Sequence, residues 1–226
     1  MKIKLAYLLI SFFLTGCSNN DDDIKTKTKT EETSATYEVR FAFDWNKTDF
    51  PTDYPNGTHF SPLVGWVHQA NNDYFATGKM ASSGIEQMAE EGITTTLVNE
   101  LQALIDTGLG LKTYTGNGLN AGVGTITLEL TVTKDFPALT LATMVAPSPD
   151  WYVACVAENL LTEDGFVSER SITGIVYDAG TDNGTTFTSP NSDTNPKAAI
   201  AEITQPPLGD GTKVKASFCS ITFTKK

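Results

Sequence analysis

The chain has 226 residues, of which 40% are hydrophobic and 10% aromatic, with 16 Lys and Arg against 27 Asp and Glu. This length supports one substantial domain or two small ones, and the apolar content excludes a chain that is disordered throughout. The formal net charge of −11 repels phosphate backbones. Because the sequence has no basic stripe to offset that charge, nucleic acid is excluded as a partner.

The first 17 residues, MKIKLAYLLISFFLTGC, have the pattern of a secretion signal with a lipid-attachment site. The apolar run from Leu5 to Leu14 rises only about 15 Å as a helix, which is too short for a hydrocarbon core of about 30 Å. Leu14-Thr15-Gly16-Cys17 resembles the bacterial lipobox, whose cysteine is acylated before cleavage. We therefore expect residues 1–16 to be a lipoprotein signal peptide and Cys17 to anchor the mature chain in a membrane. An ordinary signal with a chance cysteine is the alternative.

Residues 17–35 are predicted to be the lipidated cysteine and a disordered tether. Ile24 is the single large aliphatic residue between Ser18 and Thr36, so this stretch cannot bury enough surface to order itself. Its acidic run Asp21-Asp22-Asp23 resembles signals that send bacterial lipoproteins to the outer face of the outer membrane, which predicts a cell-surface lipoprotein. The alternative is an acidic stretch that only keeps the chain soluble.

Residues 36–226 contain neither a Pro/Ser-rich linker nor an internal repeat, which predicts one domain. Its first element is a strand over residues 37–45, because aromatic and β-branched residues alternate with polar ones at period two. The alternation places one side of this strand in a core.

Two helices are predicted next. Ser83-Gly84-Ile85-Glu86 matches a capping box, and leucines, Val98 and Ile105 recur at helical spacing from Leu97 until Gly108. Gly92 is expected to separate the helices. We expect the pair to lie across one end of the fold as an insertion.

The rest of the chain predicts strands. Residues 125–133 repeat the period-two alternation, and further β-rich runs separated by turn residues cover 139–145, 151–157, 171–177 and 214–224. Many short strands between turns predict a mainly β fold, a sandwich with a short helical insertion.

Signatures of common hydrolases are absent from the sequence. The only histidines are His59 and His68, and neither H-E-x-x-H nor G-x-S-x-G occurs, so zinc proteases and nucleophile-elbow hydrolases are disfavoured. Glu158 and Glu169 are either a glycosidase pair or ordinary loop acids. The sequence has three tryptophans, Trp45, Trp66 and Trp151. They form either a sugar-stacking platform or part of the hydrophobic core.

Two acidic loops could hold a metal ion. In Pro147-Ser148-Pro149-Asp150-Trp151 two prolines restrict the backbone beside Asp150, and the glycine-containing loop that begins at Asp178 adds Asp182 four residues on. Calcium takes six to eight oxygen ligands, which aspartates, carbonyls and water can supply. Ordinary surface acids in Asx-turns would show the same spacing.

These residues resemble the spondin domain family. The matching segments run in family order: 43–45 (FDW), 60–68 (FSPLVGWVH), 81–84 (ASSG), 88–92 (MAEEG), 147–151 (PSPDW), 178–184 (DAGTDNG) and 188–191 (TSPN). The resemblance implies a C2-like antiparallel β-sandwich with one calcium ion at a loop end, where Asp150, Asp178 and Asp182 match the acidic ligands. It also implies an extracellular adhesion or binding role. We therefore expect a cell-surface adhesion or ligand-binding module without a catalytic step, whose ligand is an extracellular protein or glycan. The sequence departs from the family at Ala154, where glycine is usual.

Two alternatives stay open for the function and one for the cysteines. A secreted glycan-acting hydrolase would need two carboxylates apart from the metal, and calcium-dependent lipid binding would follow from the C2-like fold. Once Cys17 is lipidated, Cys155 and Cys219 are left in an oxidising compartment, where they could form a disulfide or remain two buried thiols.

Overall fold

The computed structural model describes residues 31–72 and 74–226, in which Glu32–Lys226 is one compact unit. The expected signal peptide, Cys17 and most of the expected tether lie outside the described residues. The first strand, β1, is Ser34–Asp44, so ordered structure begins two residues before the expected boundary at residue 36. Ser34 and Ala35 are already paired in a sheet, with Thr133 and Val132.

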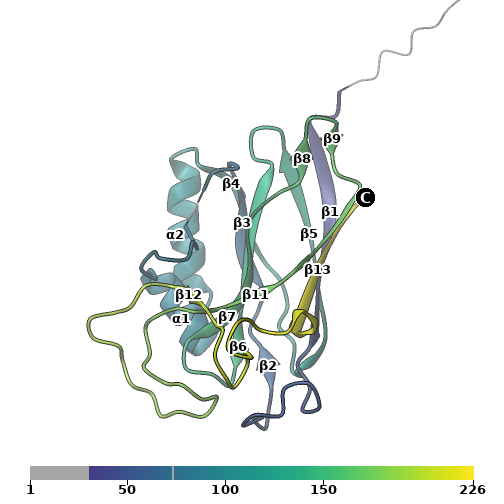
Figure 1. The fold of residues 1–226 in the computed structure, drawn as a ribbon. Helices are drawn as coiled ribbons and strands as arrows, with labels where there is room; N and C mark the ends of the chain where they lie inside the picture. Colours follow the sequence, from purple (N-terminus) through teal and green to yellow (C-terminus); the bar gives the residue numbers. More distant parts are fainter. Residues whose placement is uncertain (1–30, 73) are drawn as a thin grey trace, which may run out of the picture. The chain divides into compact units, whose positions relative to one another are not determined.

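The domain is built on two antiparallel sheets and is mainly β, as the sequence predicts (Figure 1). The smaller sheet has the order β10 (Glu169–Thr173), β13 (Cys219–Lys225), β1 and β5 (Val123–Thr133). The larger has the order β12 (Ala201–Glu202), β11 (Ile175–Asp178), β7 (Trp151–Asn159), β6 (Ala138–Ala146), β3 (Val64–His68) and β4 (Gly110–Thr115). In addition β2 (His59–Phe60) pairs with β6, and a hairpin joins β8 (Leu161–Thr162) to β9 (Gly165–Phe166).

The main core lies between the sheets and follows the alternation in the sequence. In β1 the side chains of Tyr37, Val39, Phe41 and Phe43 are at most 3% exposed. Trp45 and Trp151, 0% and 4% exposed, belong to this core as well, whereas Trp66, 0% exposed, is buried in a second core under the helices. Their burial excludes a surface platform made of these three rings.

The two helices, α1 (Ser83–Glu91) and α2 (Thr95–Asp106), form a third layer on the larger sheet. They pack on β3, β4, β6 and β7, where apolar helix residues such as Met88 and Leu101 make a second core with Trp66 and Ala142 (Figure 1). Covered on both faces, β6 is buried along all nine residues. The expectation that the helices cross one end of the sandwich is therefore wrong.

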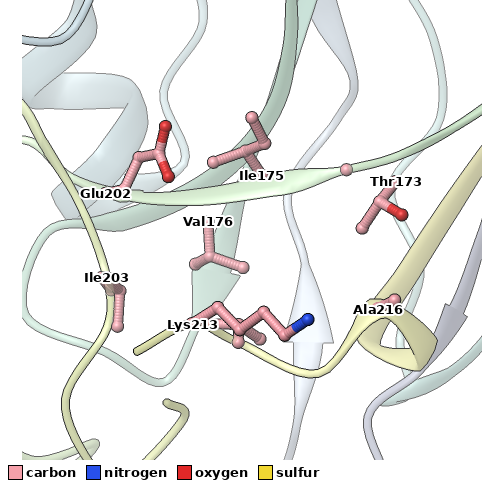
Figure 2. A pocket seen from close by; sticks show the side chains of 9 residues that line it. Thr173, Ile175, Val176, Glu202, Ile203, Lys213 and Ala216 are labelled. Atoms are coloured by element: carbon pink, nitrogen blue, oxygen red, sulfur yellow. The ribbon is translucent and has the colours of Figure 1, made fainter. Parts of the chain in front are cut away.

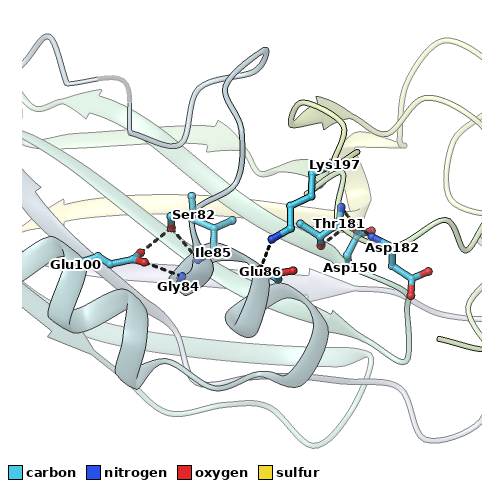
Figure 3. Close-up of polar contacts among 9 residues, drawn as sticks. All are labelled: Ser82, Gly84, Ile85, Glu86, Glu100, Asp150, Thr181, Asp182 and Lys197. Carbon is cyan, nitrogen blue, oxygen red and sulfur yellow. Dashed lines mark hydrogen bonds and ion pairs between the residues drawn. The ribbon is translucent and has the colours of Figure 1, made fainter. Parts of the chain in front are cut away.

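The N-terminal cap of α1 links the two helices. The cap of α1 is Ser82, one residue before the predicted position, and its hydroxyl oxygen accepts from the Ile85 amide at 3.1 Å. The partner carboxylate comes from α2, since Glu100 accepts from the Ser82 hydroxyl at 2.6 Å and from the Gly84 amide at 3.0 Å (Figure 3). Gly92 ends α1 in the left-handed conformation, with φ of 70°, as predicted.

The run at residues 171–177, expected to be one strand, is divided between the sheets. Its first part belongs to β10 and its second to β11, with Gly174 at the crossing. A Cβ atom on Gly174 would lie 2.8 Å from the sulfur of Cys219, so only glycine fits there. The last expected run also starts late, because a 3₁₀ turn at Ala216–Phe218 precedes β13.

Within the described part of the chain, no helix combines the length and apolarity needed to cross a bilayer.

Candidate metal centre

Asp150 lies in a tight turn between β6 and β7. The Ser148 hydroxyl donates to the Val145 carbonyl at 2.5 Å and accepts from the Trp151 amide at 3.2 Å, which fixes the turn at both ends. Asp150 is completely buried. A buried carboxylate is costly unless partners compensate its charge, so its surroundings are informative.

One oxygen of Asp150 joins the two acidic loops. Oδ2 accepts three hydrogen bonds, from the backbone amides of Thr181 and Asp182 at 2.7 and 3.1 Å and from the Thr181 hydroxyl at 3.2 Å (Figure 3). The structure thus brings together residues that are about thirty positions apart, as the calcium hypothesis requires.

The other oxygen of Asp150 has no hydrogen-bond partner although it is sealed from solvent. An ionised carboxylate can only accept, so this oxygen faces no donor that would compensate its charge. Buried orphan acceptors are rare and call for an explanation such as an ion.

Asp178 is the last residue of β11, and Asp182 lies in the loop that follows it. Asp178 accepts from the Gly180 amide at 2.8 Å, and Asp182 accepts from the amides of Gly184 at 2.6 Å and Ser192 at 2.8 Å. Each aspartate therefore closes its own turn, which is the Asx-turn role. Asp182 is nevertheless only 5% exposed, so it is not an ordinary surface acid.

The carboxylates of the two loops repel one another. Burial raises the pKa of Asp150, and the charge of Asp182 raises it further, against the lowering effect of the amides of Thr181 and Asp182. Burial and then the charge of Asp150 raise the pKa of Asp178 to about 6. Proximity of like charges is the state that a divalent cation relieves.

The three aspartates share one end of the domain, but they do not form a closed cage. In residues 31–72 and 74–226, no group of three or more Asp, Glu, His or Cys side chains could hold a metal ion as arranged. The donor set still fits a hard cation, because Asp150 presents a buried oxygen without a hydrogen-bond partner. In addition, each oxygen of Asp178 and Asp182 that accepts one hydrogen bond has a second lone pair available for a cation. The sequence-based assignment of calcium to these residues stays a prediction.

Sequence reasoning missed Glu90, an acidic residue near the end of α1. Its pKa is raised by burial above all, and also by the charges of Glu86, Asp150 and Asp182, while the Thr181 side chain lowers it. Glu90 thus belongs electrostatically to the same cluster.

The other candidate residues lie elsewhere in the fold. Cys155 on β7 and Cys219 on β13 are free, buried thiols in opposite sheets, and burial raises the pKa of Cys155 to about 12. Glu158 forms an ion pair with Arg170 at 2.5 Å. The proposed glycosidase pair therefore has one member already engaged by a cation.

Two hollows border the edge of the larger sheet. One, of about 310 Å³, adjoins the acidic loops and is lined by residues including Trp151, Asp178, Gly184, Ala198, Glu202 and Pro206. The other, of about 250 Å³, lies against β11, with Val176 and Lys213 among its lining side chains (Figure 2). Glu202 and Ile203 line both hollows.

The two acidic loops, which carry Asp150 and Asp182, lie at the end of β1 opposite Ser34. Trp45, which follows β1, contacts Phe187 of the second acidic loop with ring centroids 5.2 Å apart, and Phe187 contacts Trp151 at 5.4 Å. Ser34, at the other end of the strand, pairs with Thr133.

Comparison with known proteins agrees with this architecture. The Spondin_N family matches residues 35–218. Spondin-2 from Homo sapiens is 30% identical over 177 residues, which are 75% of this chain and 53% of that protein. Spondin-1 is 33% identical in Gallus gallus over 178 residues and 32% in Rattus norvegicus over 177, in both cases 76% of this chain and 22% of the relative.

The chain thus spans about half the length of Spondin-2 and about a fifth of Spondin-1. The family match extends from the second residue of β1 to the turn before β13, so it includes both acidic loops and the helical layer. The sequence resemblance is confirmed: this chain belongs to the Spondin_N family.

Proposed function

We propose that this protein is a calcium-binding recognition or adhesion module displayed on the outer face of a bacterial outer membrane. The observation that carries the proposal is the buried, unpartnered oxygen of Asp150 at the junction of two acidic loops. Family membership supports an extracellular binding module. No catalytic step is part of the proposal.

Asp150, Asp178 and Asp182 would hold the ion, and backbone carbonyls and water would complete its six to eight oxygen ligands. Calcium would neutralise the repulsion between the loops and offer an oxygen-rich ligand a point of attachment. Because two of the aspartates also bond their own loop amides, binding would fix the loops as well as the ion.

The ligand would meet the protein beside this centre. The hollow of about 310 Å³ includes Asp178 and combines carboxylates with alanine and proline side chains. Such a lining suits an extracellular protein or glycan that presents both polar and apolar groups.

The calcium proposal is tested by thermal unfolding of residues 32–226 after chelation and after addition of calcium. Calcium at a hundredfold excess over Kd stabilises a folded state by about 2.7 kcal/mol, which for a domain of this size is roughly 5–11 °C in Tm. Asp178→Asn should blunt the rise, whereas Asp164→Asn, at the exposed tip of the β8–β9 hairpin, should not. Identical curves with chelator and calcium, and no tightly bound metal by elemental analysis, would refute the calcium site.

Anchoring needs a separate test, because Cys17 lies outside the described residues. The full chain expressed in a bacterial host should label with a fatty-acid probe and partition into detergent, and Cys17→Ala should remove both properties. Persistent labelling of the variant would exclude Cys17 as the lipidated residue.

The ligand is sought with an array of glycans and matrix proteins, probed with residues 32–226 in calcium and in chelator. Spots that appear only in calcium and vanish with Asp178→Asn would support recognition at the metal centre. Binding that is equal in both conditions would place recognition elsewhere.

A further inference from the structure

Glu90 occupies a position where a carboxylate does not favour its own helix. It lies in the last turn of α1, which has no basic residue. The C-terminal end of a helix carries partial negative charge, so an acidic side chain there is unfavourable. A residue that opposes local helix stability points to a role outside the helix.

Packing brings this turn of α1 to the start of β7. A Cβ atom on Gly92, the C-cap of α1, would lie 3.1 Å from Ser61 and 3.2 Å from the Met144 methyl group. Met144 in turn pairs with Tyr152, two residues after Asp150. The last turn of α1 therefore lies close to the turn that holds Asp150.

The neighbouring turn of α1 contacts the second acidic loop. Glu86, one helical turn before Glu90 on the same face, forms an ion pair with Lys197 at 2.5 Å beside Thr181 and Asp182 (Figure 3). Lys197 is thus engaged by Glu86.

The charges around Glu90 are consistent with this placement. Burial above all raises the pKa of Glu90, the charges of Glu86, Asp150 and Asp182 raise it further, and the Thr181 side chain lowers it. The last turn of α1 thus approaches the end of the domain where Asp150, which is 0% exposed, keeps one oxygen without a hydrogen-bond partner.

We propose that Glu90 supplies a fourth carboxylate to the calcium centre and thereby ties the helical layer to the loops. The inference rests on the proposed function, since it needs the ion that Asp150, Asp178 and Asp182 would hold. Calcium affinity depends on the number of charged ligands, so removal of one should weaken it strongly.

The test compares Glu90→Gln with Glu91→Gln. Both changes remove one negative charge from the same helix turn and keep a good helix former, but the side chain of Glu91 is exposed to solvent. Calcium Kd is measured by calorimetry on residues 32–226, and amide hydrogen exchange of α1 is followed with and without calcium.

We expect Glu90→Gln to raise Kd at least about tenfold and Glu91→Gln to change it less than about threefold, because the exposed charge is screened. In the wild type, calcium should slow exchange in α1, and Glu90→Gln should abolish that slowing. Unfolding in chelator should show Glu90→Gln to be at least as stable as the wild type, since repulsion is relieved.

Equal affinities and equal protection of α1 in both variants would overturn the role of Glu90 while leaving the calcium centre intact. A wild type that binds no calcium would overturn both proposals. Loss of stability of Glu90→Gln in chelator would show a structural role instead.

Discussion

Two substitutions of Asp150 separate its role in holding the loops together from its proposed role as a calcium ligand. In Asp150→Ala the amides of Thr181 and Asp182 lose their common acceptor inside a sealed site. A buried donor left without a partner costs about 1–3 kcal/mol, so two of them cost roughly 2–6 kcal/mol. The corresponding fall in Tm is roughly 4–24 °C for a domain of this size.

Asp150→Asn should behave differently. Its amide oxygen can take the place of Oδ2 and accept the same three hydrogen bonds, while the charge that burial and Asp182 disfavour is gone. In chelator we expect its free energy of unfolding to lie within about 1 kcal/mol of the wild type. Neither variant should gain stability from calcium, since both lack the buried anionic oxygen.

The measurement is urea unfolding of the wild type and both variants, in chelator and in millimolar calcium. If Asp150→Asn is as unstable in chelator as Asp150→Ala, the charge itself rather than the hydrogen-bond set holds the loops, and the reasoning is refuted. If Asp150→Asn retains the full response to calcium, Asp150 is not a ligand.

Three further predictions concern the core. Gly65→Ala should cost about 3 kcal/mol or more, because its Cβ would lie 1.9 Å from the Thr140 carbonyl oxygen in the middle of a sheet, and near-normal urea stability would contradict this. Burial lowers the pKa of His68 below 6.5, so the unfolded chain binds a proton at this residue more readily than the folded one. The free energy of unfolding should therefore be at its full value above pH 6.5 and fall as the pH drops below 6.5. His68→Gln should remove that loss in urea series at several pH values, and an unchanged slope would exclude His68 as its source. Alkylation without reductant should modify Cys155 and Cys219 only after denaturation, as expected for the two free thiols of the structure, whereas an intact mass lower by two hydrogens would reveal a disulfide.

Period-two strands were predictable because their two faces meet different surroundings. The alternation in β1 and β5 places those strands to within three residues of the observed ends. In β3 and β6 the alternation is lost, since helices cover one face and the opposite sheet covers the other, and every residue is buried. Residues 139–145 of β6 were still recognised as a β-rich run, whereas β3 was not predicted.

Long-range features of the fold were not predictable from local patterns. The requirement for glycine at position 174 comes from the nearby sulfur of Cys219, and the cap of α1 depends on Glu100 from the next helix. Both partners are distant in sequence from the position they determine.

The same limit applies to the site. The two acidic loops could be singled out because aspartates, prolines and glycines cluster locally, and the structure joins them through Asp150. Glu90 could not, because a glutamate in a helix is ordinary in sequence and only the packing of α1 on β7 gives it acidic neighbours.

The position of the loops at the far end of β1 has a mechanical consequence for an anchored protein. The chain enters the domain at Ser34, and the eleven residues of β1 extend about 35 Å toward the loops. A ligand that pulls on the loops while the chain is held at Ser34 would load β1 along its length, between β5 on one side and β13 on the other. Antiparallel ladder bonds run perpendicular to the strands, so such a force shears many of them at once instead of opening them one by one.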